Sequence, residues 1–112
     1  MEEEIMTIIL NAGDARSKCL LALKSARKGE FEKAKEQLKQ VSQSMILAHN
    51  VQTRLIQKEM TGEKHQVSLL MVHAQDHLMT AMAIRDMVEE MVAYAEELNK
   101  KMEESFCRIL SS

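Results

Sequence analysis

Proline is absent from the chain and glycine occurs only three times in 112 residues, so few positions can interrupt a helix. Aromatic residues are equally scarce, with two phenylalanines and one tyrosine. Alanine, leucine, methionine, lysine, glutamate and glutamine dominate instead, and these residues favour helices. The composition therefore predicts an all-α protein, and the length predicts one domain spanning residues 1–112.

Other features that the chain lacks exclude several classes of partner and of cellular location. The formal net charge is only −2, which gives no reason to expect nucleic acid or an anionic membrane surface as a partner. No apolar run approaches the roughly 18 residues that span a bilayer. The chain opens with acidic residues rather than with the basic stretch of a signal peptide. Cys19 and Cys107 show no metal-type spacing and are expected to be free thiols of a reducing compartment. We therefore expect a cytoplasmic protein without direct membrane insertion.

Apolar residues recur at intervals of three and four, which predicts amphipathic helices over residues 3–28, 31–60 and 66–108. Gly29 is placed to end the first helix, and Gly62 ends the second within the break at 61–65. Three helices with two short connections predict an antiparallel three-helix bundle. The end at about 101–112 is more polar, and we expect it to project from the bundle or to fray.

Three positions carry interpretations of their own. Gly13 lies within the first helix, where glycine costs about 1 kcal/mol relative to alanine, so it indicates either close helix packing or a functional surface. His49 lies beside Gln52, a polar residue of the apolar seam of the second helix, and we interpret His49 as a core histidine with a hydrogen-bonded partner. His65, in the break, is expected to be an ordinary exposed residue.

The stretch at 67–91 carries the strongest candidate site. His73, Asp76, His77 and Thr80 follow the spacing that places them on one face of a helix. Apolar residues precede and follow them on that face, so the cluster is a polar island in an apolar stripe. Burying such groups unpaired costs roughly 1–3 kcal/mol each. The pattern fits a buried polar network, a metal site, or a histidine that acts as a nucleophile or as an acid–base group.

The same helix is apolar around most of its circumference, over a wider arc than two neighbouring helices can cover. A helix with such an arc requires additional burial. We therefore expect the chain to self-associate, with the third helices of several copies packed around a symmetry axis.

Several chemistries are not indicated. The chain has neither a P-loop nor a G-x-G-x-x-G motif, so no nucleotide site is predicted. The histidine motif lacks the glutamate of H-E-x-x-H, which argues against a zinc protease. The alternative to a catalytic site is a non-catalytic helical adaptor, or a metal-binding bundle, with a buried His/Asp network.

Four blocks of the sequence resemble one family. They are NAGDARSKCLLAL at 11–23, GEFEKAKEQL at 29–38, AHNVQTRLI at 48–56 and VSLLMVHAQDHLMTAM at 67–82. In this order and register they are similar to the lactose/cellobiose family of enzyme IIA proteins, including the diacetylchitobiose branch. These proteins are phosphocarriers of the bacterial phosphoenolpyruvate-dependent sugar phosphotransferase system.

The resemblance implies a homotrimer of three-helix protomers and a phosphotransferase role. It implies that His73 accepts a phosphoryl group on Nε2 from the phosphocarrier HPr and passes it to a cysteine of the cognate enzyme IIB. It further implies that Asp76 faces its symmetry mates and shares one Mg²⁺ per trimer, with His77 as a supporting hydrogen-bond residue. Lactose, cellobiose and diacetylchitobiose all fit as the transported sugar.

Overall fold

The computed structural model describes residues 1–64 and 66–112, and among these it contains three helices and no strand. The helices are α1 (Glu2–Arg27), α2 (Phe31–Met60) and α3 (Leu69–Ser111). The predicted all-α class is confirmed, and the bounds of the first two helices agree within one residue. His65, which we expected to be exposed, lies outside the described residues.

Glycines and one serine set the ends of the helices. Gly29 and Gly62 have φ of 78° and 98°, a left-handed conformation that glycine adopts without steric cost and that reverses the chain after a helix. The side chain of Ser68 accepts a hydrogen bond of 3.1 Å from the backbone N–H of Met71 and caps α3. The prediction that the third helix begins at residue 66 is therefore wrong, because the cap places its first turn at Leu69.

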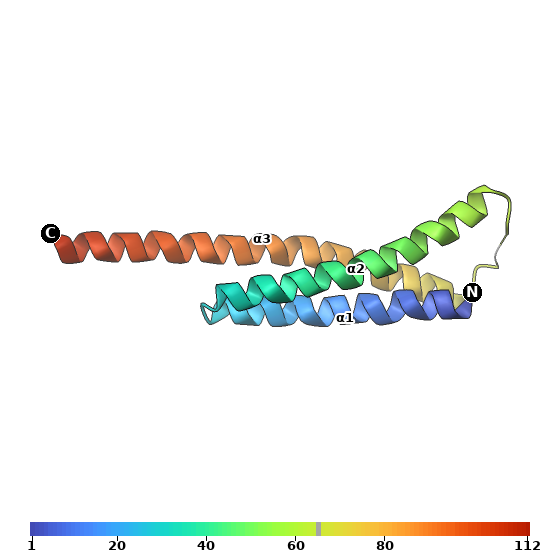
Figure 1. Ribbon diagram of the computed structural model, residues 1–112, viewed down its shortest axis with the longest axis horizontal. Coiled ribbons are helices and arrows are strands. Elements are labelled where there is room, and N and C mark those ends of the chain that lie inside the picture. The colour runs from blue at the N-terminus through green and yellow to red at the C-terminus, as the bar shows by residue number, and fades with distance from the viewer. Residues whose placement is uncertain (65) are drawn as a thin grey trace.

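The three helices run up, down and up, so α3 returns alongside α1 in the same direction (Figure 1). α1 packs against both other helices, whereas α2 and α3 make fewer contacts with each other than either makes with α1. The face of α1 that is buried between them carries small residues, which allows close approach. They are Ala12, Ala15, Cys19, Ala22 and Ala26. The core thus lies along α1, and each flank of α3 is covered by a different helix.

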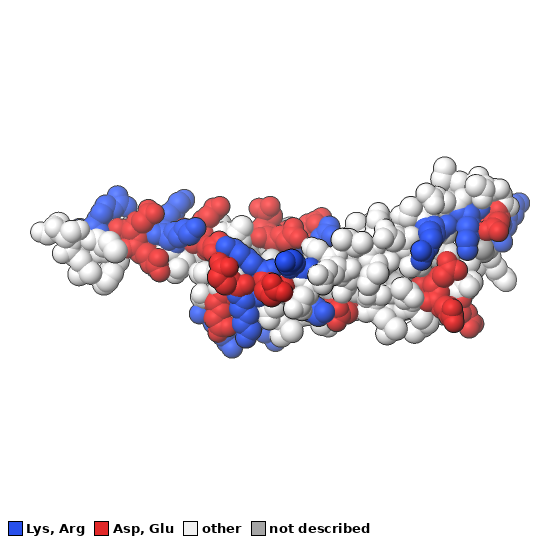
Figure 2. Space-filling model, in the orientation of Figure 1, with Lys and Arg blue, Asp and Glu red and all other residues white. Residues whose placement is uncertain are grey.

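The last third of α3 extends beyond the α1–α2 hairpin (Figure 1). Lys35 Nζ lies 2.9 Å from Glu96 Oε2 and links the start of α2 to α3. Residues 97–112 are all exposed, yet the helix continues to Ser111. The polar end that we expected to project or fray is thus a projecting, regular helix. Figure 2 shows side chains of both charges along it and fewer charges on the middle of the bundle.

The side of α3 that turns away from α1 and α2 carries large apolar side chains. Among them, Leu69 is 85% exposed, Tyr94 68% and Met87 63%. No helix of the described residues is both long enough and apolar enough to cross a membrane. A single chain therefore leaves an extended apolar face of α3 uncovered.

Candidate functional site

The two histidines lie on adjacent turns of α3, near its capped start. The ring centroids of His73 and His77 are 5.2 Å apart, and the ring planes are inclined by 52°. His73 is exposed, whereas His77 is half-buried. One imidazole can therefore be reached from solvent while the other is held against the bundle.

His77 lies against α1 at Gly13. A Cβ atom added at Gly13 would come within 3.9 Å of His77 Nε2, which is an ordinary van der Waals contact. Gly13 also has no positive φ, so neither space nor backbone conformation requires a glycine there. The close-packing interpretation of Gly13 is therefore wrong. The absence of a side chain leaves room beside His77.

Replacing Gly13 by alanine is expected to stabilise the protein by up to about 1 kcal/mol, because alanine is the better helix former and its methyl group fits. Urea unfolding at fixed protein concentration measures the change. Gly29→Ala serves as the contrasting variant and should destabilise, because Gly29 has a φ of 78°. A loss of stability in Gly13→Ala would show that the two helices pack more tightly at Gly13 than the structure indicates.

Asp76 is exposed and lies on the uncovered face of α3. At about 100° per residue, it lies about 60° around the helix from His73. Thr80, predicted to share the site, donates its hydroxyl to the backbone carbonyls of Asp76 at 2.8 Å and of His77 at 3.1 Å. The hydroxyl of Thr80 is thus occupied within its own helix.

The polar island is not buried within one chain, because His73 and Asp76 are both exposed. The interpretation as a buried His/Asp network is therefore wrong for the single chain. Among the residues that the structure describes, no group of three histidine, cysteine, aspartate or glutamate side chains is placed to hold a metal ion. A metal site built on Asp76 would need carboxylates from more than one chain.

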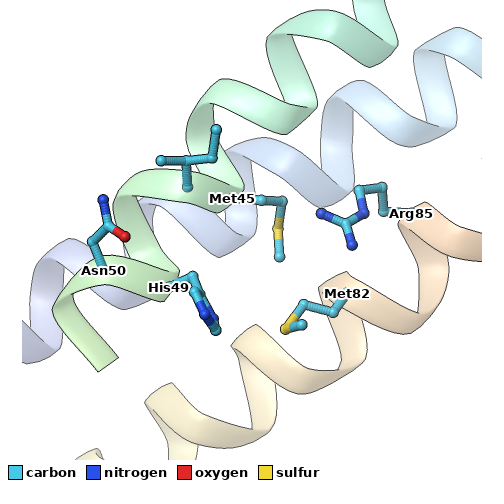
Figure 3. A pocket seen from close by; sticks show the side chains of 6 residues that line it. Met45, His49, Asn50, Met82 and Arg85 are labelled. Atoms are coloured by element: carbon cyan, nitrogen blue, oxygen red, sulfur yellow. The ribbon is translucent and has the colours of Figure 1, made fainter. Parts of the chain in front are cut away.

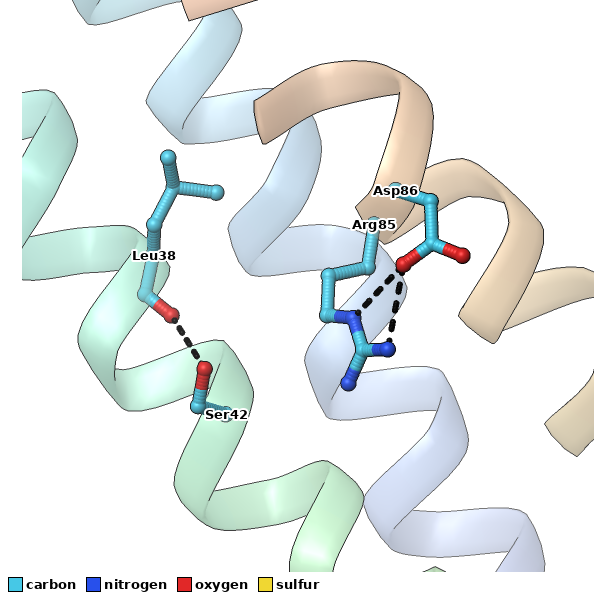
Figure 4. A network of polar contacts seen from close by, with 4 residues as sticks. All are labelled: Leu38, Ser42, Arg85 and Asp86. Atoms are coloured by element: carbon cyan, nitrogen blue, oxygen red, sulfur yellow. Dashed lines mark hydrogen bonds and ion pairs between the residues drawn. The ribbon is translucent and has the colours of Figure 1, made fainter. Parts of the chain in front are cut away.

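His49 is exposed rather than buried in the core. It lines a groove of about 240 Å³ between α2 and α3, into which Met45, Met82 and Arg85 also point (Figure 3). The core-histidine interpretation is therefore wrong, because α2 and α3 make few contacts with each other and leave this seam open. Arg85 pairs with the adjacent Asp86 at 3.0 Å (Figure 4).

Sequence reasoning missed the partner of Gln52. Its Nε2 donates a hydrogen bond to Oε1 of Gln75, which joins α2 to α3. Both side chains are half-buried. Gln75 lies between the two histidines of the motif, and this position was the sequence signal that could have identified it as a residue of the site.

The carboxylate of Asp14 lies on the side of α1 that faces α2, and it forms bonds within α1 and to α2. Its carboxylate accepts hydrogen bonds from Lys18 Nζ at 2.9 Å and from Ser44 Oγ at 2.7 Å. The hydrogen bond from Lys18, followed by that from Ser44, holds the pKa of Asp14 below its usual value. This carboxylate therefore joins the two helices and does not reach the histidine pair.

Comparison with known proteins shows which family the chain belongs to. The model of the family described as "PTS system, Lactose/Cellobiose specific IIA subunit" matches residues 3–96. The chain is 43% identical over 101 residues to the lichenan-specific phosphotransferase enzyme IIA component of Bacillus subtilis (strain 168). This match covers 90% of the chain and 92% of that protein.

Solved structures agree with the sequence match. The PTS cellobiose-specific enzyme IIA from Bacillus anthracis superimposes with a TM-score of 0.85 at 38% identity, over 89% of this chain and 92% of that one. A second similar structure is the solution structure of the IIA(chitobiose)–HPr complex from the N,N'-diacetylchitobiose branch of the Escherichia coli phosphotransferase system. There the TM-score is 0.74 at 42% identity, over 88% of this chain and 95% of that one.

Proposed function

Because the chain belongs to the lactose/cellobiose-specific IIA family of the sugar phosphotransferase system, we propose that it carries a phosphoryl group on His73. The donor in this proposal is the phosphohistidine of HPr, and the acceptor is a cysteine of the cognate enzyme IIB. The observation that carries the proposal is the exposure of His73, beside a half-buried His77, on the uncovered face of α3.

The chemistry requires one nitrogen lone pair on His73. The N–P bond of the phosphohistidine in HPr breaks as a new N–P bond forms at Nε2 of His73. That bond later breaks as an S–P bond forms at the cysteine thiolate of enzyme IIB. Such transfers need little from the protein beyond positioning and charge stabilisation. In this proposal His77, whose ring centroid lies 5.2 Å from that of His73, supports the phosphoryl group through a hydrogen bond.

The surroundings of His73 suit transient docking of two different partners. Leu70, one turn before His73 on the same side of α3, is 40% exposed and offers an apolar contact beside the histidine. HPr as the donor is supported by the similar IIA(chitobiose) protein, whose solution structure is a complex with HPr.

The assembly in this proposal is a homotrimer built on the uncovered face of α3. Asp76, Met87 and Tyr94 lie within about 20° of one another around the helix, and all three are exposed. Packing three copies of α3 on this face would bury the apolar side chains. It would also bring three Asp76 carboxylates together, which is an oxygen donor set that fits Mg²⁺. One ion shared per trimer would neutralise their charge.

Sedimentation equilibrium at micromolar concentration is expected to give three times the chain mass. The physical reason is the apolar face of α3, which one chain leaves exposed over most of its length. A stable monomer with the same helical circular dichroism spectrum would contradict the trimer.

The phosphocarrier proposal is tested by reconstituting the relay. Incubation with phosphoenolpyruvate, enzyme I and HPr should load one acid-labile phosphate on each chain. Addition of the cognate enzyme IIB should then remove it. A chain that takes no phosphate under conditions in which HPr is phosphorylated would refute the proposal.

A further inference from the structure

The projecting end of α3 carries apolar side chains that neither α1 nor α2 covers. Residues 97–112 extend past the α1–α2 hairpin (Figure 1), and every one of them is exposed in the single chain. They also lie beyond residues 3–96, the part of the chain that the family model matches. Leu98, Met102 and Ile109 are nevertheless large, apolar and exposed. Apolar side chains at helical spacing indicate a surface that another helix covers.

These apolar positions continue a repeat that begins within the bundle. From Met87 onward they follow steps of four, three and four residues, and this 11-residue pattern occurs twice. At about 100° per residue, eleven residues return to the same side of a helix within about 20°. An 11-residue repeat is typical of helices that coil around one another with a right-handed twist. The positions form one stripe, here called the distal stripe, which consists of Met87, Met91, Tyr94, Leu98, Met102, Ser105 and Ile109.

The opposite side of the projecting segment is polar. Cys107 lies about 180° around the helix from the middle of the distal stripe, and Lys100 and Glu103 lie on either side of Cys107. All three side chains are exposed. Figure 2 shows side chains of both charges along this end of the molecule. The segment is therefore amphipathic, with one side suited to contact with another helix and the other suited to water.

Continuity along α3 favours further copies of the same helix as the occupants of the distal stripe. Met87 and Tyr94 belong both to this stripe and to the face on which the proposed trimer is built, and α3 runs uninterrupted from there to Ser111. Three α3 helices packed on that face would leave the bundle in parallel and at the same height. Because the ends are already held together, their effective concentration is high and further packing costs little additional entropy.

We propose that the ends of three α3 helices form a parallel three-stranded coiled coil, which projects beyond the body of the trimer with the distal stripe facing its axis. This inference rests on the proposed trimer and extends its contacts to residues that the family model does not match. Like positions of the three chains meet in layers along such an axis. Ser105 places a layer of hydroxyl groups between the apolar layers of Met102 and Ile109.

Cysteine cross-linking tests which side of the projecting helix faces the axis. Ser105→Cys is combined with Cys107→Ser in the full chain, and a short bismaleimide is added to the native protein. Because three copies of position 105 meet at the axis, two chains of each trimer should become covalently joined on a denaturing gel. The wild-type protein is the matched control, since exposed Cys107 faces outward and should react without joining chains. Cys19 is buried in both proteins.

Two substitutions to glutamine measure what the distal stripe contributes to stability. Met102→Gln removes an apolar contact from each chain, and glutamine is nearly as good a helix former as methionine. The thermal unfolding midpoint at fixed protein concentration should fall by several degrees. Lys100→Gln changes an exposed residue about 200° around the helix and should leave the midpoint unchanged. An unchanged midpoint in Met102→Gln would overturn the inference.

Sedimentation of the cross-linking variant separates the remaining outcomes. A trimer that is not joined through Ser105→Cys, or one that is joined equally through Cys107, would overturn the inference because the distal stripe would not face the axis. A mass of six chains would overturn it too, since the ends of a second trimer would then cover the stripe. A monomer mass would refute the trimer itself. Phosphate uptake from phospho-HPr is measured separately on the same variants, so failure of the phosphocarrier function is distinguishable from failure of the coiled coil.

Discussion

His73→Gln is expected to abolish phosphorylation by phospho-HPr and to leave the helical fold intact. Glutamine resembles histidine in size and polarity but offers no imidazole nitrogen to form the N–P bond. The side chain is exposed, so the substitution leaves no cavity in the core. Incorporation of labelled phosphate from phosphoenolpyruvate, with enzyme I and HPr present, measures the loss. Circular dichroism checks the fold.

The neighbouring histidines supply the controls for this assignment. His77→Ala should still accept one phosphate, at a lower rate, because His77 supports the group without carrying it. His49→Ala should also remain phosphorylatable, because His49 lies in the groove between α2 and α3. If His73→Gln still carries one acid-labile phosphate per chain, the acceptor is another residue.

Removal of divalent cations is expected to weaken the wild-type trimer but not an Asp76→Leu variant. Two carboxylates about 5 Å apart repel each other by about 3 kcal/mol at an effective dielectric constant near 20. Three such charges at an axis therefore require a shared cation or protonation. Leucine deletes the repulsion and adds apolar contact, so the variant trimer should be at least as stable as the wild type.

Thermal unfolding of both proteins, each with Mg²⁺ and with a chelator at neutral pH, tests this expectation. The chelator should lower the midpoint of the wild-type protein by several degrees and leave that of Asp76→Leu unchanged. The matched control is Asp86→Leu, which removes a carboxylate that is paired with Arg85 at 3.0 Å and should retain the wild-type response to chelator. An equal response in the wild type and in Asp76→Leu would show that Asp76 holds no metal.

The sequence by itself determined the helical class and most of the helix bounds, because the glycines that end α1 and α2 are visible in the chain. It also determined that His73, Asp76 and His77 lie on neighbouring turns, since helical periodicity relates residues three and four apart. The start of α3 was missed by three residues, because it is set by the side-chain cap that Ser68 forms.

Only the tertiary structure decided what surrounds those side chains. The position of Gly13 beside His77 depends on the alignment of α1 with α3, and the bond between Gln52 and Gln75 depends on that of α2 with α3. His49 lies beside the apolar seam of α2 in sequence, yet it is exposed because α2 and α3 make few contacts with each other. Periodicity shows which residues share a face of one helix. The neighbour that covers each face depends on packing between helices distant in sequence, which no local pattern specifies.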